Sequence, residues 1–223
     1  MNDFRRVRKL FKDTITRITS EEALSHELRE AAFPAYAHRN PFIDFVFWKR
    51  LEVVYNLLTS PGHVLDFGCG SGVMAYALAE KGLKVTAVDI EFGPLNTIRS
   101  RIVFPADIRF CNDRLKNLQL ALRSFDFVIA LDVLEHINDL DEILGLFAGL
   151  LKDDGLLIVS GPTENVLYKL GRRVAGKEFP GDYHVSDISS VKRRMERYYR
   201  ITETKKLVWP FVLFEIIGAR LIV

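Results

Sequence analysis

A glycine-rich segment after an apolar stretch is the part of this sequence with the clearest chemical meaning. Val64–Phe67 leads directly into Gly68-Cys69-Gly70-Ser71-Gly72. Glycines at alternating positions let the main chain turn sharply and approach a ligand closely. The N-terminus of a following helix offers free N–H groups that suit a carboxylate, and Asp66 can accept hydrogen bonds from an ammonium group. The segment therefore predicts a site for a ligand that carries both groups.

Acidic residues also stand at the ends of the next apolar stretches. Asp89 ends the stretch Lys84–Asp89, where a carboxylate can accept hydrogen bonds from ribose hydroxyls. Asp113 follows a weaker strand-like stretch, where a carboxylate can take an adenine amino group. Leu131 and Asp132 end the fourth stretch, at the crevice where a sheet of this kind reverses its strand order. These positions predict that the ligand also contains a nucleoside.

Strand-like and helix-like stretches alternate from residue 63 onward. We expect strands at His63–Phe67, Lys84–Asp89, Ile108–Cys111, Phe125–Leu131 and Leu156–Ser160. We expect helices at Val73–Lys81, Pro94–Ile102, Arg114–Leu122, Asp139–Leu151 (closed by Asp154-Gly155) and, after the fifth strand, Asp187–Tyr199. This alternation predicts an α/β fold with a parallel sheet covered by helices on both faces. Ile201–Val208 and Phe214–Val223 are separated by too few residues for a crossover helix, so they should form an antiparallel hairpin.

The first sixty residues are expected to form an N-terminal helical cap. An apolar stripe at helical spacing marks the first helix: Phe4, Val7, Phe11, Ile15 and Ile18. Thr19 and Glu22 resemble a capping box that starts a second helix through about Ala32, and a third helix is expected over Phe42–Leu58. The domain organisation that follows is a cap over residues 1–60 and one domain over residues 61–223, with a lid insertion at about 162–185.

Four segments of the chain resemble the class I S-adenosylmethionine-dependent methyltransferases. VLDFGCGSG is similar to their D-x-G-x-G-x-G loop, and VTAVDI, FDFVIALDVLEHI and LKDDGLLIVSGP resemble their later landmarks in the same order. The resemblance implies a Rossmann-like seven-stranded sheet, mostly parallel, of order 3-2-1-4-5-7-6 and ending in an antiparallel hairpin. The cofactor would be S-adenosylmethionine, held by Asp66, Gly68, Cys69, Gly70, Gly72, Asp89, Ile90, Asp113, Arg114, Leu131 and Asp132.

A nicotinamide dinucleotide is the main rival ligand for this loop. Its fingerprint reads G-x-G-x-x-G, whereas this chain reads G-x-G-x-G, and no second nucleotide-binding half follows.

Two segments of the chain resemble the ubiquinone-pathway O-methyltransferases. They are Asp132–His136, which follows the fourth predicted strand, and the stretch VDIEFGPL. This likeness implies O-methylation of a small molecule, with N- or C-methylation or a non-catalytic cofactor-binding scaffold as alternatives. The candidate catalytic residues are His136, Tyr183 and His184, as base or positioning donors. In some relatives the matching positions bind a divalent metal, which here would use Asp132, Glu135, His136 and His184. A capping or orienting role for Glu135 and His136 is the alternative.

Bulk composition limits the partners. The net charge is +2, so a nucleic-acid partner is not expected. The two cysteines, Cys69 and Cys111, do not suggest a disulfide framework, and a cytoplasmic location is expected.

Basic residues flank apolar stripes in the first helix and in Thr163–Phe179. These stripes favour either a lid with peripheral membrane contact or helices packed on the core. The sequence does not specify an oligomeric state.

Overall fold

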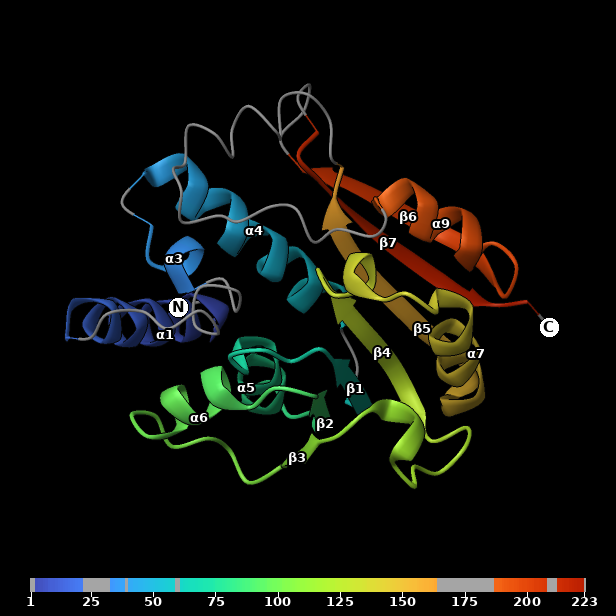
Figure 1. The fold of residues 1–223 in the computed structure, drawn as a ribbon, viewed down its shortest axis with the longest axis horizontal. Coiled ribbons are helices and arrows are strands. Elements are labelled where there is room, and N and C mark those ends of the chain that lie inside the picture. The colour runs from blue at the N-terminus through green and yellow to red at the C-terminus, as the bar shows by residue number, and fades with distance from the viewer. Residues whose placement is uncertain are drawn as a thin grey trace.

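A computed structural model describes residues 3–21, 33–38, 40–58, 61–163, 187–207 and 212–222. These residues form one twisted sheet with helices on both of its faces (Figure 1). The sheet has seven strands in the order β3-β2-β1-β4-β5-β7-β6, as the sequence predicts. The strands are β1 (His63–Phe67), β2 (Lys84–Asp89), β3 (Ile108–Asn112), β4 (Phe125–Leu131), β5 (Leu151–Pro162), β6 (Tyr199–Leu207) and β7 (Phe214–Leu221).

The strand pairing places the functional candidates at one edge of the sheet. β1 pairs in parallel with β2 on one side and with β4 on the other, so the strand order reverses at β1. β3 and β5 extend the parallel part outward. The predicted hairpin is confirmed, because β7 pairs antiparallel with both β5 and β6. The carboxyl ends of the parallel strands therefore meet at a single edge, which in folds of this kind is the ligand edge.

Helices cover the two faces around two hydrophobic clusters. One cluster draws on α1 (Asp3–Glu21), α3 (Phe33–Tyr36), α4 (Pro41–Leu57), α5 (Val73–Glu80) and α6 (Gly93–Arg99). The other draws on the short 3₁₀ turns η1 (Leu115–Asn117) and η2 (Leu134–His136), on α7 (Leu140–Leu150) and on α9 (Ile188–Met195). Three helices begin with side-chain caps that satisfy free N–H groups, from Asn40, Asp139 and Asp187.

The N-terminal helix α1 packs its apolar stripe inward. Phe4, Val7, Phe11, Ile15 and Ile18 are all buried, in the same cluster as residues of α4, α5 and the sheet. This packing supports the core-packing alternative for the first helix over the membrane-contact alternative.

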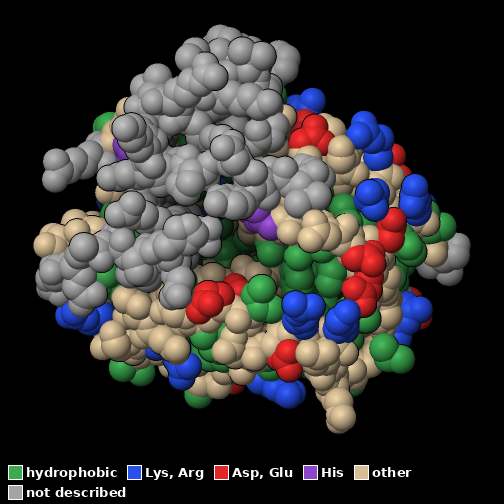
Figure 2. Space-filling view, viewed as in Figure 1, with side chains coloured by type: hydrophobic (Ala, Val, Ile, Leu, Met, Phe, Trp, Pro, Cys, Tyr) green, Lys and Arg blue, Asp and Glu red, His purple; other side chains and the backbone are tan. Residues whose placement is uncertain are grey.

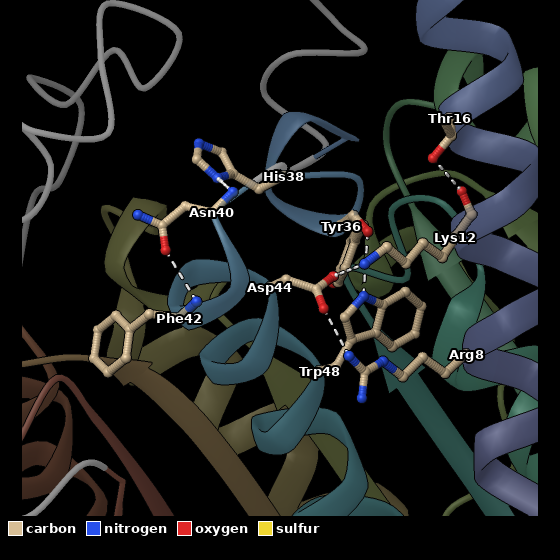
Figure 3. Close-up of polar contacts among 9 residues, drawn as sticks. All are labelled: Arg8, Lys12, Thr16, Tyr36, His38, Asn40, Phe42, Asp44 and Trp48. Atoms are coloured by element: carbon tan, nitrogen blue, oxygen red, sulfur yellow. Dashed lines mark hydrogen bonds and ion pairs between the residues drawn. The ribbon is translucent and has the colours of Figure 1, made fainter.

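A polar clamp adds to the contact between α1 and α4. The carboxylate of Asp44 on α4 accepts from Arg8 at 2.6 Å and from Lys12 at 2.7 Å, both on α1 (Figure 3). Asp44 itself is buried, whereas the two cations are more than a third exposed, so we expect the clamp to fix the angle of α1 more than to stabilise the fold.

Some sequence predictions are wrong in detail. The helix predicted over Arg114–Leu122 is only the 3₁₀ turn Leu115–Asn117, and of its expected apolar face Leu115 is buried whereas Leu122 is 74% exposed. β5 begins at Leu151, so Asp154-Gly155 lies inside the strand and does not close α7. Thr19 does not start a second helix: it lies within α1, and its hydroxyl donates to the carbonyl of Thr16. In the part of the chain that the structure describes, no helix is both long and apolar enough to span a membrane.

Candidate functional site

The glycine loop forms a sharp turn between β1 and α5. Gly68, Gly70 and Gly72 have φ angles of 73°, 52° and 77°, in the left-handed region that favours glycine. A Cβ atom at Gly68 would lie 2.6 Å from Val133 Cγ2, and one at Gly72 would lie 2.8 Å from Leu95 Cδ1. At Gly70 a Cβ would meet nothing within 4 Å. Gly68 and Gly72 are thus needed for packing, whereas Gly70 leaves open space of the kind a closely approaching ligand can use.

Asp66 lies at the end of β1 with an unused acceptor atom. The residue is 3% exposed, and among the described residues its Oδ2 has no hydrogen-bond partner. Burial, and after it the nearby charge of Asp89, together raise the pKa of its carboxyl from 3.8 to about 7. A buried carboxylate with one unpartnered oxygen suits a cationic ligand, because a cation would pair its charge and supply the missing hydrogen bond.

Asp89 joins the glycine loop to the end of β2. Its Oδ2 accepts from the main-chain N–H of Gly70 at 2.8 Å, and its Oδ1 accepts from Glu91 N at 3.1 Å. The next residue, Ile90, is 71% exposed although it is apolar. An acidic group beside an exposed apolar side chain matches the polar and flat apolar parts of a nucleoside.

Asp113 and Arg114 follow β3 on the same edge. Oδ1 of Asp113 accepts from Arg114 N and from Asn117 Nδ2, both at 2.7 Å. These local bonds fix the turn into η1, and the contact of Asp113 with a ligand amino group stays a prediction. Cys69, also predicted at the cofactor, is buried within the glycine loop, and burial raises the pKa of its thiol, so it stays protonated.

Leu131 and Asp132 end β4 next to the glycine loop. Asp132 has a φ of 53°, which is unusual for a residue other than glycine. Its carboxylate accepts from Ser160 Oγ at 3.1 Å and forms an ion pair with Arg50 of α4. Nothing in the sequence pattern singles out Arg50, since it lies within a helix far from Asp132 along the chain. Sequence reasoning therefore missed this contact.

The structure describes only two of the other acceptor-side candidates. Glu135 is buried and His136 is exposed, both on the η2 turn just after Asp132. Tyr183, His184 and nearly all of the predicted lid lie outside the described residues. Within the described ranges, no group of three or more His, Cys, Asp or Glu side chains is placed to hold a metal ion. Both carboxylate oxygens of Asp132 already have protein donors, which weakens its case as a metal ligand.

The predicted cofactor residues thus gather at the carboxyl ends of β1, β2, β3 and β4. Figure 2 shows acidic and hydrophobic side chains, and a histidine, exposed near the centre of this view. The unpaired Asp66 oxygen, the open space at Gly70 and the carboxylate of Asp89 together fit a nucleoside ligand that carries an amino-acid part.

Comparison with known proteins agrees with this class of fold and site. A family model described as "Methyltransferase domain" matches residues 36–206. The chain belongs to this family and has the class I fold of S-adenosylmethionine-dependent methyltransferases.

The sequence relatives include ubiquinone biosynthesis O-methyltransferases. The one from Xanthomonas campestris pv. campestris is 30% identical over 149 residues, which is 62% of this chain and 61% of the relative. The one from Stutzerimonas stutzeri is 29% identical over 154 residues, 66% of this chain and 63% of the relative. The chain thus spans about three fifths of the length of the curated relatives it matches.

Solved structures share the fold at lower identity. The PH0226 protein from Pyrococcus horikoshii has a TM-score of 0.67 at 20% identity, covering 90% of this chain and 100% of that one. The 1,6-didemethyltoxoflavin-N1-methyltransferase of Burkholderia thailandensis, solved with S-adenosylhomocysteine, has a TM-score of 0.61 at 20% identity, covering 91% of this chain and 93% of that one.

Proposed function

We propose that this methyltransferase transfers a methyl group from S-adenosylmethionine to an oxygen atom of a small molecule. The observation that carries the ligand assignment is the buried, unpartnered Oδ2 of Asp66 beside the open glycine turn. The choice of oxygen rests on the 30% identity to the ubiquinone biosynthesis O-methyltransferases.

Each predicted site residue is assigned to the part of the cofactor that suits its chemistry. Asp66 pairs with the ammonium group, and the N–H groups beyond Gly70 face the carboxylate. Asp89 accepts from the ribose hydroxyls, and Ile90 packs on the adenine ring. Asp113 and Arg114 hold the adenine edge, and Leu131 and Asp132 border the crevice beside the glycine loop. Each assignment is a proposal for one side chain and can be tested one variant at a time.

Most of the rate acceleration in this reaction comes from positioning the acceptor oxygen against the methyl group. When bound, S-adenosylmethionine supplies a methyl group on a sulfonium that is already a good leaving group. The protein therefore has to hold the acceptor oxygen in line and exclude water. A hydroxyl must also lose its proton, and His136 is exposed close after β4, where an imidazole can take it. Tyr183 and His184 remain predicted partners in the same role.

The acceptor atom is tested with a matched pair of small molecules. Catechol and 1,2-diaminobenzene have the same ring and substitution but offer oxygen or nitrogen. Formation of S-adenosylhomocysteine and of a methylated product should be followed for both, with and without a chelator. Methylation of catechol alone supports the proposal, and methylation of the diamine alone favours the N-methyltransferase alternative. Tight S-adenosylhomocysteine binding with no turnover of either molecule favours a cofactor-binding scaffold.

A further inference from the structure

Arg50 and Asp132 form a buried ion pair at the carboxyl edge of the sheet. Arg50 is 3% exposed, whereas the side chain of Asp132 keeps 22% of its surface exposed. The guanidinium packs against a pair of aromatic rings that contact each other, 5.2 Å from the centroid of Phe47 and 5.1 Å from that of Phe214. Burying a guanidinium this deeply is costly unless a counter-ion pairs with it. The arrangement thus places a fixed cation behind a carboxylate that still reaches the surface.

Asp132 is held more firmly than a surface carboxylate. Its main-chain N–H donates to the carbonyl of Ser160 at 2.9 Å. Its carboxylate accepts a hydrogen bond from the hydroxyl of Ser160 and forms an ion pair with the guanidinium of Arg50. These three contacts keep the residue in a left-handed conformation that is uncommon outside glycine. Such a conformation persists only when the surroundings determine it, and it occurs often at functional sites.

The position of this carboxylate is next to the proposed cofactor cradle. Val133, the following residue, lies against Gly68 of the glycine loop. On the other side, Phe214 begins β7 opposite Pro162 at the end of β5. Asp132 therefore lies between the glycine loop and the C-terminal end of β5. Each of its oxygens has room for a second hydrogen bond, because a carboxylate oxygen carries two acceptor sites.

We propose that Asp132 binds and orients the acceptor by accepting a hydrogen bond from its hydroxyl group, and that Arg50 is the positioning residue for Asp132. The proposal rests on the proposed function, because it concerns the acceptor of that same reaction. It adds a residue from the N-terminal helices to the site. Arg50 fixes the direction of the carboxylate, and the proton of the acceptor goes to a different base.

The first test uses the unaltered protein saturated with S-adenosylhomocysteine and needs no turnover. Calorimetry should compare catechol with 1,2-difluorobenzene, which has a similar shape and no hydrogen-bond donor. We expect catechol to bind about tenfold or more tightly, since a hydrogen bond to a charged group would be lost with the fluorinated ring. Equal affinity for the two rings, or binding of neither, overturns the proposal.

Variants then separate Asp132 from its positioning residue. Asp132→Asn and Arg50→Gln should each raise the Kd of catechol about 10- to 100-fold, while the Kd of S-adenosylhomocysteine changes less. Arg50→Lys should recover part of the loss, because lysine keeps the charge but not the planar fork. Lys49→Gln is the matched control, since Lys49 is an exposed neighbour paired with Glu52, and it should bind catechol as the wild type does.

Two further measurements distinguish a loss of acceptor binding from a folding defect. If Arg50→Gln does not fold, as its melting temperature would show, Ser160→Ala removes another donor to Asp132 without leaving a charge unpaired and should still weaken catechol binding severalfold. In turnover, the variants should raise KM for catechol more than they lower kcat, whereas a structural role alone would lower the active fraction and leave KM unchanged. Wild-type catechol affinity in Arg50→Gln and Asp132→Asn overturns the proposal. Failure to methylate catechol contradicts the proposed function instead, and the binding comparison still decides the role of Asp132.

Discussion

The main-chain N–H of Gly70 donates a hydrogen bond of 2.8 Å to Oδ2 of Asp89 and so ties the glycine loop to the end of β2. The other oxygen of Asp89 accepts from Glu91 N, which fixes the direction of the carboxylate. Asp89 thus has a local structural task as well as its proposed contact with the ribose. A variant at this position will act through both.

Replacing Asp89 by Ala should weaken S-adenosylhomocysteine binding by about 1–3 kcal/mol, since the ribose hydroxyls and the Gly70 N–H would lose their acceptor. Calorimetry on the wild type and on Asp89→Ala measures this change. Asp89→Asn keeps an oxygen for the Gly70 N–H and should lose less. An Asp89→Ala affinity equal to that of the wild type would show that the ribose is held elsewhere.

Gly70 and Gly68 should respond differently to the same added methyl group. Gly70→Ala places its Cβ in open space, so it should fold and yet bind S-adenosylhomocysteine far more weakly, because the methyl group would occupy ligand space. The left-handed conformation adds a cost of about 1–2 kcal/mol. Gly68→Ala would collide with Val133 and should lower the melting temperature more. Melting curves and calorimetry on both variants check the contrast, and undiminished binding by Gly70→Ala would contradict the cofactor assignment.

The raised pKa of Asp66 predicts two pH dependences. Between pH values of about 4 and 7 the native protein holds a proton that the unfolded chain has lost, because burial raises this pKa from 3.8 to about 7. The contribution of Asp66 to stability therefore falls as pH rises through this range, by about 1.4 kcal/mol per pH unit, and is constant above it. Asp66→Asn should remove this slope from the ligand-free protein in denaturant titrations at several pH values.

Ligand affinity should depend on pH in the opposite sense. Only the ionised form of Asp66 pairs with an ammonium group, so affinity for S-adenosylhomocysteine should rise with pH up to about 7. It should fall again at alkaline pH, where the α-amino group of the ligand loses its proton. Calorimetry in two buffers with different ionisation enthalpies should detect proton release near pH 6. A flat affinity from pH 5 to 7 would contradict the pairing of Asp66 with the ammonium group.

The sequence predicts the sheet well because its signals are local. The ends of β1 to β4 carry a glycine or an acid, and too few residues separate the last two strands for a crossover. The start of β5 was missed because Asp153 and Asp154 interrupt the apolar pattern, although β4 still pairs with Leu151. The helix predicted after Arg114 is wrong although leucines stand there at helical spacing, because the chain buries Leu115 and leaves Leu122 74% exposed.

The contacts around Asp132 were less predictable because they join residues that are far apart along the chain. Asp132 can be placed at the end of β4 from the sequence alone, but its left-handed conformation and its pairing with Arg50 depend on how α4 packs. Similarly, Asp44 reads as one more acid on a helix until α1 brings Arg8 and Lys12 to it. Buried ion pairs between segments have no local pattern, so they emerge only from the fold.

The N-terminal helix offers the last prediction, which concerns stability. Phe11 is fully buried, and its ring lies 5.3 Å from Tyr76 and 6.1 Å from Phe104 between centroids. Phe104 in turn lies beside Gly72, so α1 packs behind the glycine loop. Phe11→Ala should therefore lower the free energy of unfolding by about 3–5 kcal/mol, through lost burial and the cavity left behind. The exposed neighbour Leu10→Ala is the matched control and should change it by less than about 1 kcal/mol.

Urea denaturation of both variants, with turnover measured on the same samples, distinguishes packing from a lid. If α1 serves as packing, Phe11→Ala loses stability while turnover per folded molecule stays close to that of the wild type. A lid would give the reverse, with little loss of stability and a raised KM for the acceptor. Deletion of residues 1–18 would remove all five buried residues of the stripe, and we expect that protein to unfold at a markedly lower temperature. A truncated protein that melts like the wild type would contradict the packing role of α1.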